Sequence, residues 1–210
     1  SLTKTTATLL AVMKLYDGGK LKLTDKVSQY LPFLRSTNKK NITIKDLLLH
    51  ESGLPPYIRF YLEVIDPNSV HGPYAQSWVD EWHRTRVSEH SYYCSDFKFK
   101  KGLVSEKESS VYNLHVADKM WLNKSFKNTI LQKIARCEMD SKRYVYSDLG
   151  FILLQQVVES IVKLPMDLYL AKEFYAPMGL QRTMYLPLQK YSKEEIMPTA
   201  ANDFLRRQDL

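Results

Sequence analysis

Hydrophobic positions recur with helical spacing near the start of the chain. Over residues 3–17 apolar side chains return every three to four positions, which predicts an amphipathic helix. Gly18 and Gly19 predict its end, because glycine accepts the left-handed conformation of a helix cap. The side chains predicted to face the core are Leu9, Leu10, Val12, Met13 and Tyr16.

A second helix is predicted within residues 41–57, where the loop-forming residues 51–56 interrupt it. Thr43 is its expected N-cap and Asp46 lies in its first turn. His50 follows the apolar positions of this helix. We interpret it as a structural histidine that bonds the loop backbone, in preference to a catalytic base.

Helical spacing returns in the last third of the chain. Helices are predicted over 125–139, over 143–165 after a short extended approach, and within 166–185, where residues 177–180 close the last one. Ser147 or Asp148 can cap the second of these helices. Its predicted buried stripe is Phe151, Leu154, Val157, Val158 and Ile161.

Residues 57–127 are rich in aromatic and charged side chains and show no clean period. We expect short helices and loops here, with 57–119 forming an inserted cap or lid within a single domain that spans 1–210. The aromatic residues of this segment either line a cleft for a sugar or peptide or pack inside the cap, and packing is the preferred interpretation. They are Trp78, Trp82, Tyr92 and Tyr93.

Composition favours a mainly α, globular protein, since glycine is scarce, with 7 among 210 residues, and few stretches alternate between apolar and polar positions. Tyrosine is unusually common, with 14 residues. The net charge of +7 comes from scattered Lys and Arg residues, so we expect a solvated basic surface and no nucleic-acid partner. Cys94 and Cys137 have no metal-ligand spacing, and their pairing stays open. We expect no metal, no cofactor and no membrane span in this chain.

The candidate chemistry begins with Ser1 and Lys4, which share one face of a helix. A serine needs a neighbour to remove its proton, and a lysine can do so when its pKa is lowered. Tyr146, just before a predicted helix start, offers a third group that can move protons.

Four motifs occur in one order along the chain: SLTK (1–4), LLLHESGLPPY (47–57), YSDLG (146–150) and FYAPMGLQRT (174–183). Together they resemble the serine β-lactamase-related superfamily of class C β-lactamases, D-alanyl-D-alanine carboxypeptidases and related esterases. The resemblance is nearest to β-lactamase-like modules of bacteroidetes, some of which are fused to N-acetylhexosaminidase-type glycoside hydrolases.

The resemblance covers about 1–56 and 120–210, and 57–119 lie outside it. It implies that Ser1 is the acylated nucleophile, that Lys4 shares its proton, and that Tyr146 assists as general base and activates the deacylating water. Asp148 stands where the family usually has asparagine. A carboxylate there would hold Lys4 charged and leave more of the base work to Tyr146.

The family's third motif, a strand with lysine or histidine before Thr/Ser-Gly, is absent from the sequence, as are the strands that precede the serine. We therefore expect a fragment: the helical subdomain of the α+β fold of β-lactamases and penicillin-binding proteins, with most of the antiparallel sheet missing. A lost oxyanion-hole donor costs roughly 3–4 kcal/mol in the transition state, so little activity is expected from this piece alone.

The function implied is a bacterial serine hydrolase or acyl transferase acting on a peptidoglycan-type amide, a β-lactam or an ester, in the periplasm or outside the cell. A fused glycoside hydrolase is a further partner that the resemblance allows. Two alternatives stay open. One is a degenerate relative that binds cell-wall fragments or a partner, and the other takes Ser1 as an N-terminal nucleophile with its own α-amine as base.

Overall fold

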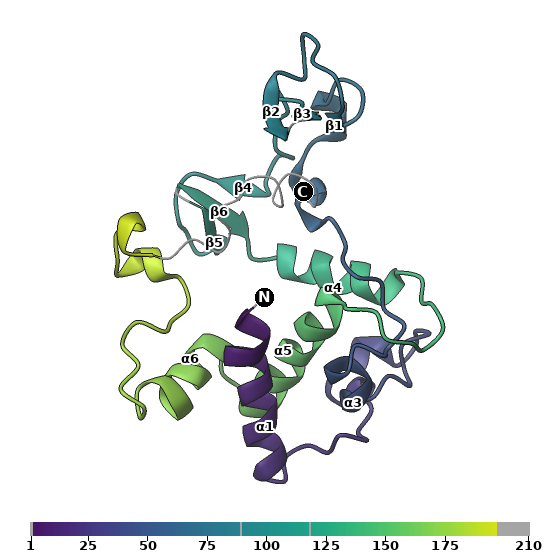
Figure 1. Cartoon of the computed structure of the whole chain (residues 1–210), viewed down its shortest axis with the longest axis vertical. Coiled ribbons are helices and arrows are strands. Elements are labelled where there is room, and N and C mark those ends of the chain that lie inside the picture. Colours follow the sequence, from purple (N-terminus) through teal and green to yellow (C-terminus); the bar gives the residue numbers. More distant parts are fainter. Residues whose placement is uncertain (1, 89, 118, 197–210) are drawn as a thin grey trace. The chain divides into compact units, whose positions relative to one another are not determined.

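The computed structural model describes residues 2–88, 90–117 and 119–196, and the chain divides into two compact units (Figure 1). Unit 1 combines residues up to Ile58 with Gln132–Ile196. Unit 2 is formed by the described residues of Arg59–Leu131. The chain thus leaves unit 1 once and returns to it.

Unit 1 is helical. Its elements are η1 (Lys4–Leu9), α1 (Leu10–Asp17), α2 (Val27–Tyr30), η2 (Pro32–Leu34), α3 (Ile44–Leu48), the end of α4 (Phe126–Arg136), α5 (Asp148–Val162), α6 (Met166–Leu170), η5 (Ala171–Tyr175), η6 (Pro187–Gln189) and η7 (Lys193–Glu195). Helix α5 contacts α1, α2, α3 and α6, so it is the centre of this unit. Its buried side chains include Leu149, Leu153, Leu154, Val157 and Val158.

The predicted helix over 3–17 is confirmed, but its opening turns are π-helical in η1 and only α1 is regular. The buried face consists of Ala7, Thr8, Ala11, Val12 and Leu15. Met13 and Tyr16, predicted to be buried, are each about half exposed. A π turn is wider than an α turn, so the face that meets the core differs from the face that a uniform 3.6-residue period predicts.

The helix predicted within 41–57 is much shorter, since α3 ends at Leu48. Its start is as predicted: the Thr43 hydroxyl accepts from the Asp46 N–H, and the Asp46 carboxylate accepts from the Thr43 N–H. The chain then turns through His50 and Gly53, both with positive φ. This turn brings the loop against the segment before α5.

Helix α5 begins at Asp148, as predicted, but Ser147 does not cap it with its side chain. The Ser147 hydroxyl instead donates to the Pro55 carbonyl at 2.6 Å. The helix predicted to start at Met166 and close at residues 177–180 is confirmed, since η5 stops at Tyr175 and Gly179 has a φ of +68°.

Unit 2 corrects the prediction of a cap made of short helices and loops. It holds η3 (Phe60–Val64), η4 (Pro67–Ser69) and two antiparallel three-stranded sheets with the orders β1-β3-β2 and β4-β6-β5. The strands are β1 (Ala75–Gln76), β2 (Thr85–Ser88), β3 (Ser91–Tyr93), β4 (Val104–Ser105), β5 (Tyr112–Ala117) and β6 (Met120–Asn123). Val64, Ile65, Leu122 and Phe126 form its buried cluster. The fold is therefore helical in unit 1, with small sheets in unit 2.

Both cysteines are free thiols, and Cys94 is buried. Within the described residues, no group of three or more His, Cys, Asp and Glu side chains is arranged to hold a metal ion. No single described helix has the length and apolar character of a membrane span. Helix α5 together with Met166–Tyr175 meets those two criteria only as a pair bent by 71°.

Candidate active site

Lys4 reaches across unit 1 to the start of α5. It projects from η1, and its Nζ donates to Asp148 Oδ1. The Lys4 side chain is 12% exposed, whereas that of Asp148 is 54% exposed. A nearly buried ammonium is thus paired with a carboxylate that faces solvent.

Aromatic rings complete the surroundings of the Lys4 ammonium. Its Nζ lies 4.8 Å from the ring centroid of Tyr146 and 5.8 Å from that of Phe151. Both distances are within the range of a cation–π interaction. Tyr146 is 45% exposed, so the tyrosine that contacts Lys4 is also open to solvent.

The ionisable groups of this cluster shift the pKa values of Lys4 and Tyr146. Burial alone would lower the pKa of Lys4, but hydrogen bonding to Asp148 and Tyr146 outweighs burial and raises that pKa. In the reverse direction, hydrogen bonding to Lys4 lowers the pKa of Tyr146. Lys4 is therefore an ammonium at neutral pH, and the phenol beside it gives up its proton more readily than an ordinary tyrosine.

The segment before α5 is fixed by the loop after α3. Four hydrogen bonds join the two: Val145 N to His50 O (2.9 Å), Ser147 N to His50 Nδ1 (3.0 Å), Ser147 Oγ to Pro55 O (2.6 Å) and Asp148 N to Pro56 O (2.8 Å). Ser147 is buried, at 1% exposed. These bonds hold the backbone on either side of Tyr146.

Gly53 is required where this loop approaches the chain. Its φ is +79°, and an added Cβ would lie 2.4 Å from the Asp140 carbonyl oxygen. The Asp140 N–H in turn donates to the Gly53 carbonyl at 2.9 Å. Ser52 is buried beside it and accepts the Leu54 N–H, in line with the prediction that these residues shape the loop.

The structure brings three of the four predicted site residues together: Lys4, Tyr146 and Asp148. The fourth, Ser1, lies outside the described residues. His50 bonds the backbone, as predicted. In unit 2, Trp82 stacks on His71 at 3.7 Å and Tyr93 packs on Tyr74 at 4.9 Å, which agrees with the packing interpretation for these two residues. For Trp78 that interpretation is wrong, because its side chain is 62% exposed.

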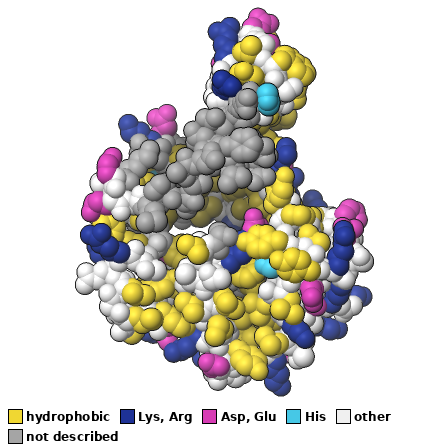
Figure 2. Space-filling model, in the orientation of Figure 1, with side chains coloured by type: hydrophobic (Ala, Val, Ile, Leu, Met, Phe, Trp, Pro, Cys, Tyr) yellow, Lys and Arg dark blue, Asp and Glu magenta, His cyan; other side chains and the backbone are white. Residues whose placement is uncertain are grey.

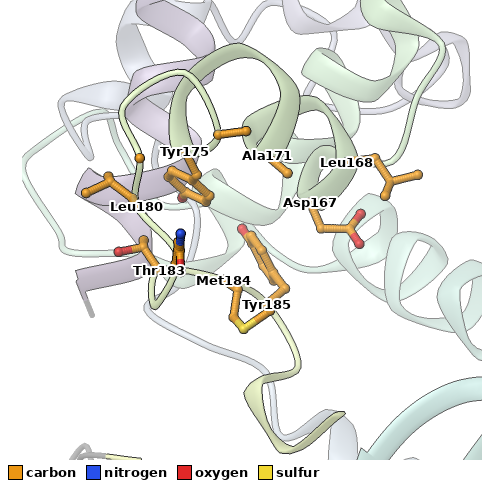
Figure 3. Close-up of a pocket in the computed structure, with 11 residues that line it drawn as sticks. Asp167, Leu168, Ala171, Tyr175, Leu180, Thr183, Met184 and Tyr185 are labelled. Atoms are coloured by element: carbon orange, nitrogen blue, oxygen red, sulfur yellow. The ribbon is translucent and has the colours of Figure 1, made fainter. Parts of the chain in front are cut away.

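A separate cavity of about 470 Å³ lies in unit 1 between α6, η5 and the segment that follows (Figure 3). Tyr175, Leu180, Met184 and Tyr185 contribute to its walls, and Lys4, Tyr146 and Asp148 do not. The Tyr185 hydroxyl is buried and has no hydrogen-bond partner among the described residues. Nothing in the sequence pattern signals this group.

Hydrophobic side chains gather on the visible face of unit 1, and Lys and Arg are scattered around it (Figure 2). Exposed apolar residues are frequent near the cavity. They include Leu168, Met178, Leu180, Met184, Leu186 and Leu188.

Comparison with known proteins shows which class of protein this chain resembles. Residues 1–92 match the family model described as Beta-lactamase. The chain is 29% identical over 196 residues to "N-acetylmuramyl-L-alanine amidase" of Bacillus subtilis (strain 168), a match covering 90% of this chain and 33% of that protein. It is 26% identical over 212 residues to "Putative D-alanyl-D-alanine carboxypeptidase" of Escherichia coli (strain K12), covering 96% and 37%.

A solved structure agrees in fold. The octameric penicillin-binding protein homologue from Pyrococcus abyssi aligns with a TM-score of 0.52 at 19% identity, over 91% of this chain and 33% of that one. The resemblance to the β-lactamase-related family is thus confirmed. The chain spans about a third of the length of these curated relatives. The family match runs past residue 56 to residue 92, so the resemblance extends into the segment that the motifs leave out.

Proposed function

We propose that this chain carries the catalytic side chains of a serine acyl-transfer enzyme, with Ser1 as nucleophile, Tyr146 as general base and Lys4 as a fixed cation. The observation that supports this most is the contact of one ammonium, that of Lys4, with both the Tyr146 ring and the Asp148 carboxylate. Residues 144 positions apart in sequence meet there.

The proton path follows from the two pKa shifts. Since Lys4 is held charged, it is a poor proton acceptor, and the Tyr146 phenolate, which Lys4 favours by lowering the pKa of the phenol, is the better base. The phenolate would take the proton of Ser1 as the serine oxygen attacks the substrate carbonyl. The same proton would pass to the leaving amine or alcohol as that bond breaks. The phenolate would then take a proton from the water that attacks the acyl group and pass it to the serine oxygen as the acyl–serine bond breaks.

The substrate class that we propose is a peptidoglycan-type amide, with β-lactams and esters as related acyl donors. The names of two relatives support it, because each refers to an amide bond, one in N-acetylmuramyl-L-alanine and the other in D-alanyl-D-alanine. Such substrates lie outside the cytoplasm, so a periplasmic or extracellular location is part of the same proposal.

The test is covalent labelling of the protein that contains this chain with a fluorescent penicillin and, separately, with a fluorophosphonate. We expect labelling that is abolished by Ser1→Ala and slowed by roughly 10²–10⁴-fold by Tyr146→Phe, the range of general base catalysis. Tyr144→Phe is the matched control, since Tyr144 lies two residues away and is 68% exposed. Labelling that persists in Ser1→Ala would refute the proposal.

A degenerate binding module is the second candidate, and one observation favours it. The Asp148 carboxylate neutralises Lys4, which weakens the cation that lowers the pKa of Tyr146. Absence of labelling by either probe, in a folded protein that still binds peptidoglycan fragments, would establish this candidate in place of the enzyme.

A further inference from the structure

We infer that His50 is a positioning residue for the proposed centre: its imidazole accepts the Ser147 N–H, packs against the Tyr146 ring, and thereby holds Tyr146 and Asp148 against Lys4. The catalytic part of this inference rests on the proposed function. The structural part stands on contacts of His50 alone.

The backbone contacts come first. His50 accepts two N–H groups from the segment before α5, one from Val145 at its carbonyl and one from Ser147 at Nδ1. These donors are the residues immediately before and after Tyr146. Because both flanking peptide groups are tied to the same residue, the main chain of Tyr146 cannot shift without breaking one of these bonds.

The ring contacts fix the side chain as well. The His50 ring lies 4.5 Å from the Tyr146 ring and 5.2 Å from the Phe151 ring, and Tyr144 meets its edge at 6.3 Å. Lys4 contacts two of the same rings, those of Tyr146 and Phe151. The imidazole therefore supports the aromatic surface on which the ammonium rests.

The main chain of His50 itself is held in an uncommon conformation. Its φ is +57°, in the left-handed region that residues other than glycine seldom adopt. A strained residue persists where its surroundings determine it, and such residues cluster at functional sites. Here the conformation aims the carbonyl and Nδ1 of one residue at the same neighbouring segment.

The bond at Nδ1 depends on protonation. Nδ1 accepts the Ser147 N–H only while it carries no proton, so the single proton of the neutral ring must lie on Nε2. A ring protonated on both nitrogens would oppose one N–H with another. His50 therefore acts as an acceptor and support, and its Nδ1 is not available as a general base.

The groups that face His50 keep it neutral. Burial lowers its pKa, and the Lys4 charge lowers it further, while the Ser147 hydrogen bond and Asp148 act in the opposite direction. The rings of Tyr144, Tyr146 and Phe151 surround the imidazole. The acceptor is thus present at neutral pH and is lost on acidification.

Two substitutions separate the roles of the ring and of Nδ1. His50→Asn places an amide oxygen where Nδ1 lies, so it can accept the Ser147 N–H and cannot titrate. His50→Phe keeps an aromatic ring and removes the acceptor. In the protein that contains this chain, we expect His50→Phe to lower kcat by roughly 10–100-fold, the effect of a small misplacement of reacting groups, with KM nearly unchanged.

His50→Asn should restore most of kcat and reduce the acid limb of the pH profile to the titration of Tyr146 alone. If His50→Phe has the kcat of the unaltered protein, the inference is wrong. Should His50→Phe fail to fold, the pH profile of His50→Asn decides: an acid limb unchanged from that of the unaltered protein overturns the inference, and an acid limb with one titrating group fewer supports it.

A measurement that does not depend on catalysis distinguishes the positioning role of His50 from the proposed enzymatic function. With tyrosine ring carbons isotopically labelled, NMR follows the titration of Tyr146, and Tyr146→Phe identifies its signal. We expect the pKa of Tyr146 to return toward 10.0, its ordinary value, in His50→Phe but not in His50→Asn. That result together with no labelling of Ser1 would reject the enzyme and keep the positioning role. An unchanged Tyr146 titration in His50→Phe would reject the positioning role.

Discussion

Asp148 decides how charge is shared among the candidate catalytic side chains. Its carboxylate accepts from Lys4 Nζ and raises the pKa of the ammonium, against the effect of burial. The family usually places an amide there, which would leave the ammonium without a neutralising partner. This one side chain therefore sets how strongly Lys4 acts on Tyr146.

The first prediction concerns Asp148→Asn. Without the carboxylate, the uncompensated charge of Lys4 should lower the pKa of Tyr146 further, so more phenolate is present at neutral pH. We expect Ser1 to be labelled several-fold faster, since a pKa change of one unit alters the phenolate population about tenfold. The measurements are the labelling rate and the NMR titration of Tyr146. Asp140→Asn, at a side chain that is 77% exposed, is the control, and a sharp fall in labelling would show that the carboxylate is needed.

The second prediction compares two buried tyrosines. The Tyr175 hydroxyl donates to the Thr6 carbonyl at 2.8 Å, whereas the Tyr185 hydroxyl has no partner among the described residues. Burial raises the pKa of Tyr185 to about 12, so its proton stays in place. Figure 3 shows both rings at the same cavity.

We expect Tyr175→Phe to lower the free energy of unfolding by about 1 kcal/mol, because its hydrogen bond to the Thr6 carbonyl is lost. Tyr185→Phe should leave that free energy unchanged or raise it by up to about 1 kcal/mol, because an unpaired buried polar group is removed. Urea unfolding of the two variants measures the difference. Equal losses would mean that the Tyr185 hydroxyl is paired in solution.

For single residues, the sequence predicts contacts between residues that stand in recognised motifs. It does not predict contacts that depend on packing between distant segments. Lys4, Tyr146 and Asp148 stand in motifs, and the structure brings them together. Lys39 is fully buried, although the scattered charge predicts solvated lysines. Its ammonium donates to Asn38 and to the Cys137 carbonyl, 98 residues away, and no local pattern records a partner at that distance.

At the level of elements, the loop after α3 depends on Gly53. Its positive φ disfavours any side chain, and the Asp140 carbonyl fills the place of a Cβ. Gly19, with a φ of +64°, has the same kind of backbone conformation, but a Cβ added there would meet no atom within 4 Å. Comparing substitutions at Gly19 and Gly53 therefore distinguishes the cost of backbone strain from the cost of a steric clash.

The third prediction follows from this pair. Gly19→Ala should cost about 1–2 kcal/mol of stability from backbone strain alone. Gly53→Ala should cost at least about 2 kcal/mol more, because the loop must move away from Asp140 or lose its bond to it. The same movement would displace His50 from Ser147, so the titration of Tyr146 should change only in Gly53→Ala. Equal effects of the two substitutions would contradict this reasoning.

Helices were predictable from spacing, and their details were not. The periods over 3–17 and 143–165 locate α1 and α5, and Thr43 marks the start of α3. The strands of unit 2 were missed because most span only two to four residues. Alternation over so few residues is too short to recognise, and register shifts interrupt the pairing of β2 with β3 and of β5 with β6.

At the scale of the whole molecule, the candidate chemistry belongs to one unit. Lys4, His50, Tyr146 and Asp148 all lie in unit 1, although unit 2 separates the first two from the last two along the chain. The motif order predicts this gathering through the family resemblance. The internal structure of unit 2 depends on the pairing of its own strands and on its own buried side chains, and the four motifs give no information about either.

Unit 2 has a buried histidine with the opposite protonation preference to His50. His83 is 1% exposed, and its two ring nitrogens face Asp80 Oδ1 at 2.9 Å and the Pro73 carbonyl at 2.7 Å. Both oxygens can only accept, so the imidazolium form, which donates from both nitrogens, satisfies both contacts. Burial would lower the pKa of His83, but the bonds to Pro73 and Asp80 outweigh burial and raise it.

The two units should therefore respond to pH in opposite directions around 6.5, the ordinary pKa of histidine. The lowered pKa of His50 gives unit 1 stability that is complete above 6.5 and is lost as pH falls through the pKa of His50 in the folded state. The raised pKa of His83 gives unit 2 stability that is complete below 6.5 and is lost as pH rises through the pKa of His83 in the folded state.

Amide hydrogen exchange, corrected for its intrinsic pH dependence, should show weaker protection of α5 about one pH unit below 6.5 and weaker protection of β3 about one unit above it. His50→Asn should remove only the acid effect and Asp80→Asn should reduce only the alkaline one, because each acts on one histidine. Loss of protection in both units at the same side of 6.5 would mean that these two rings do not control their units.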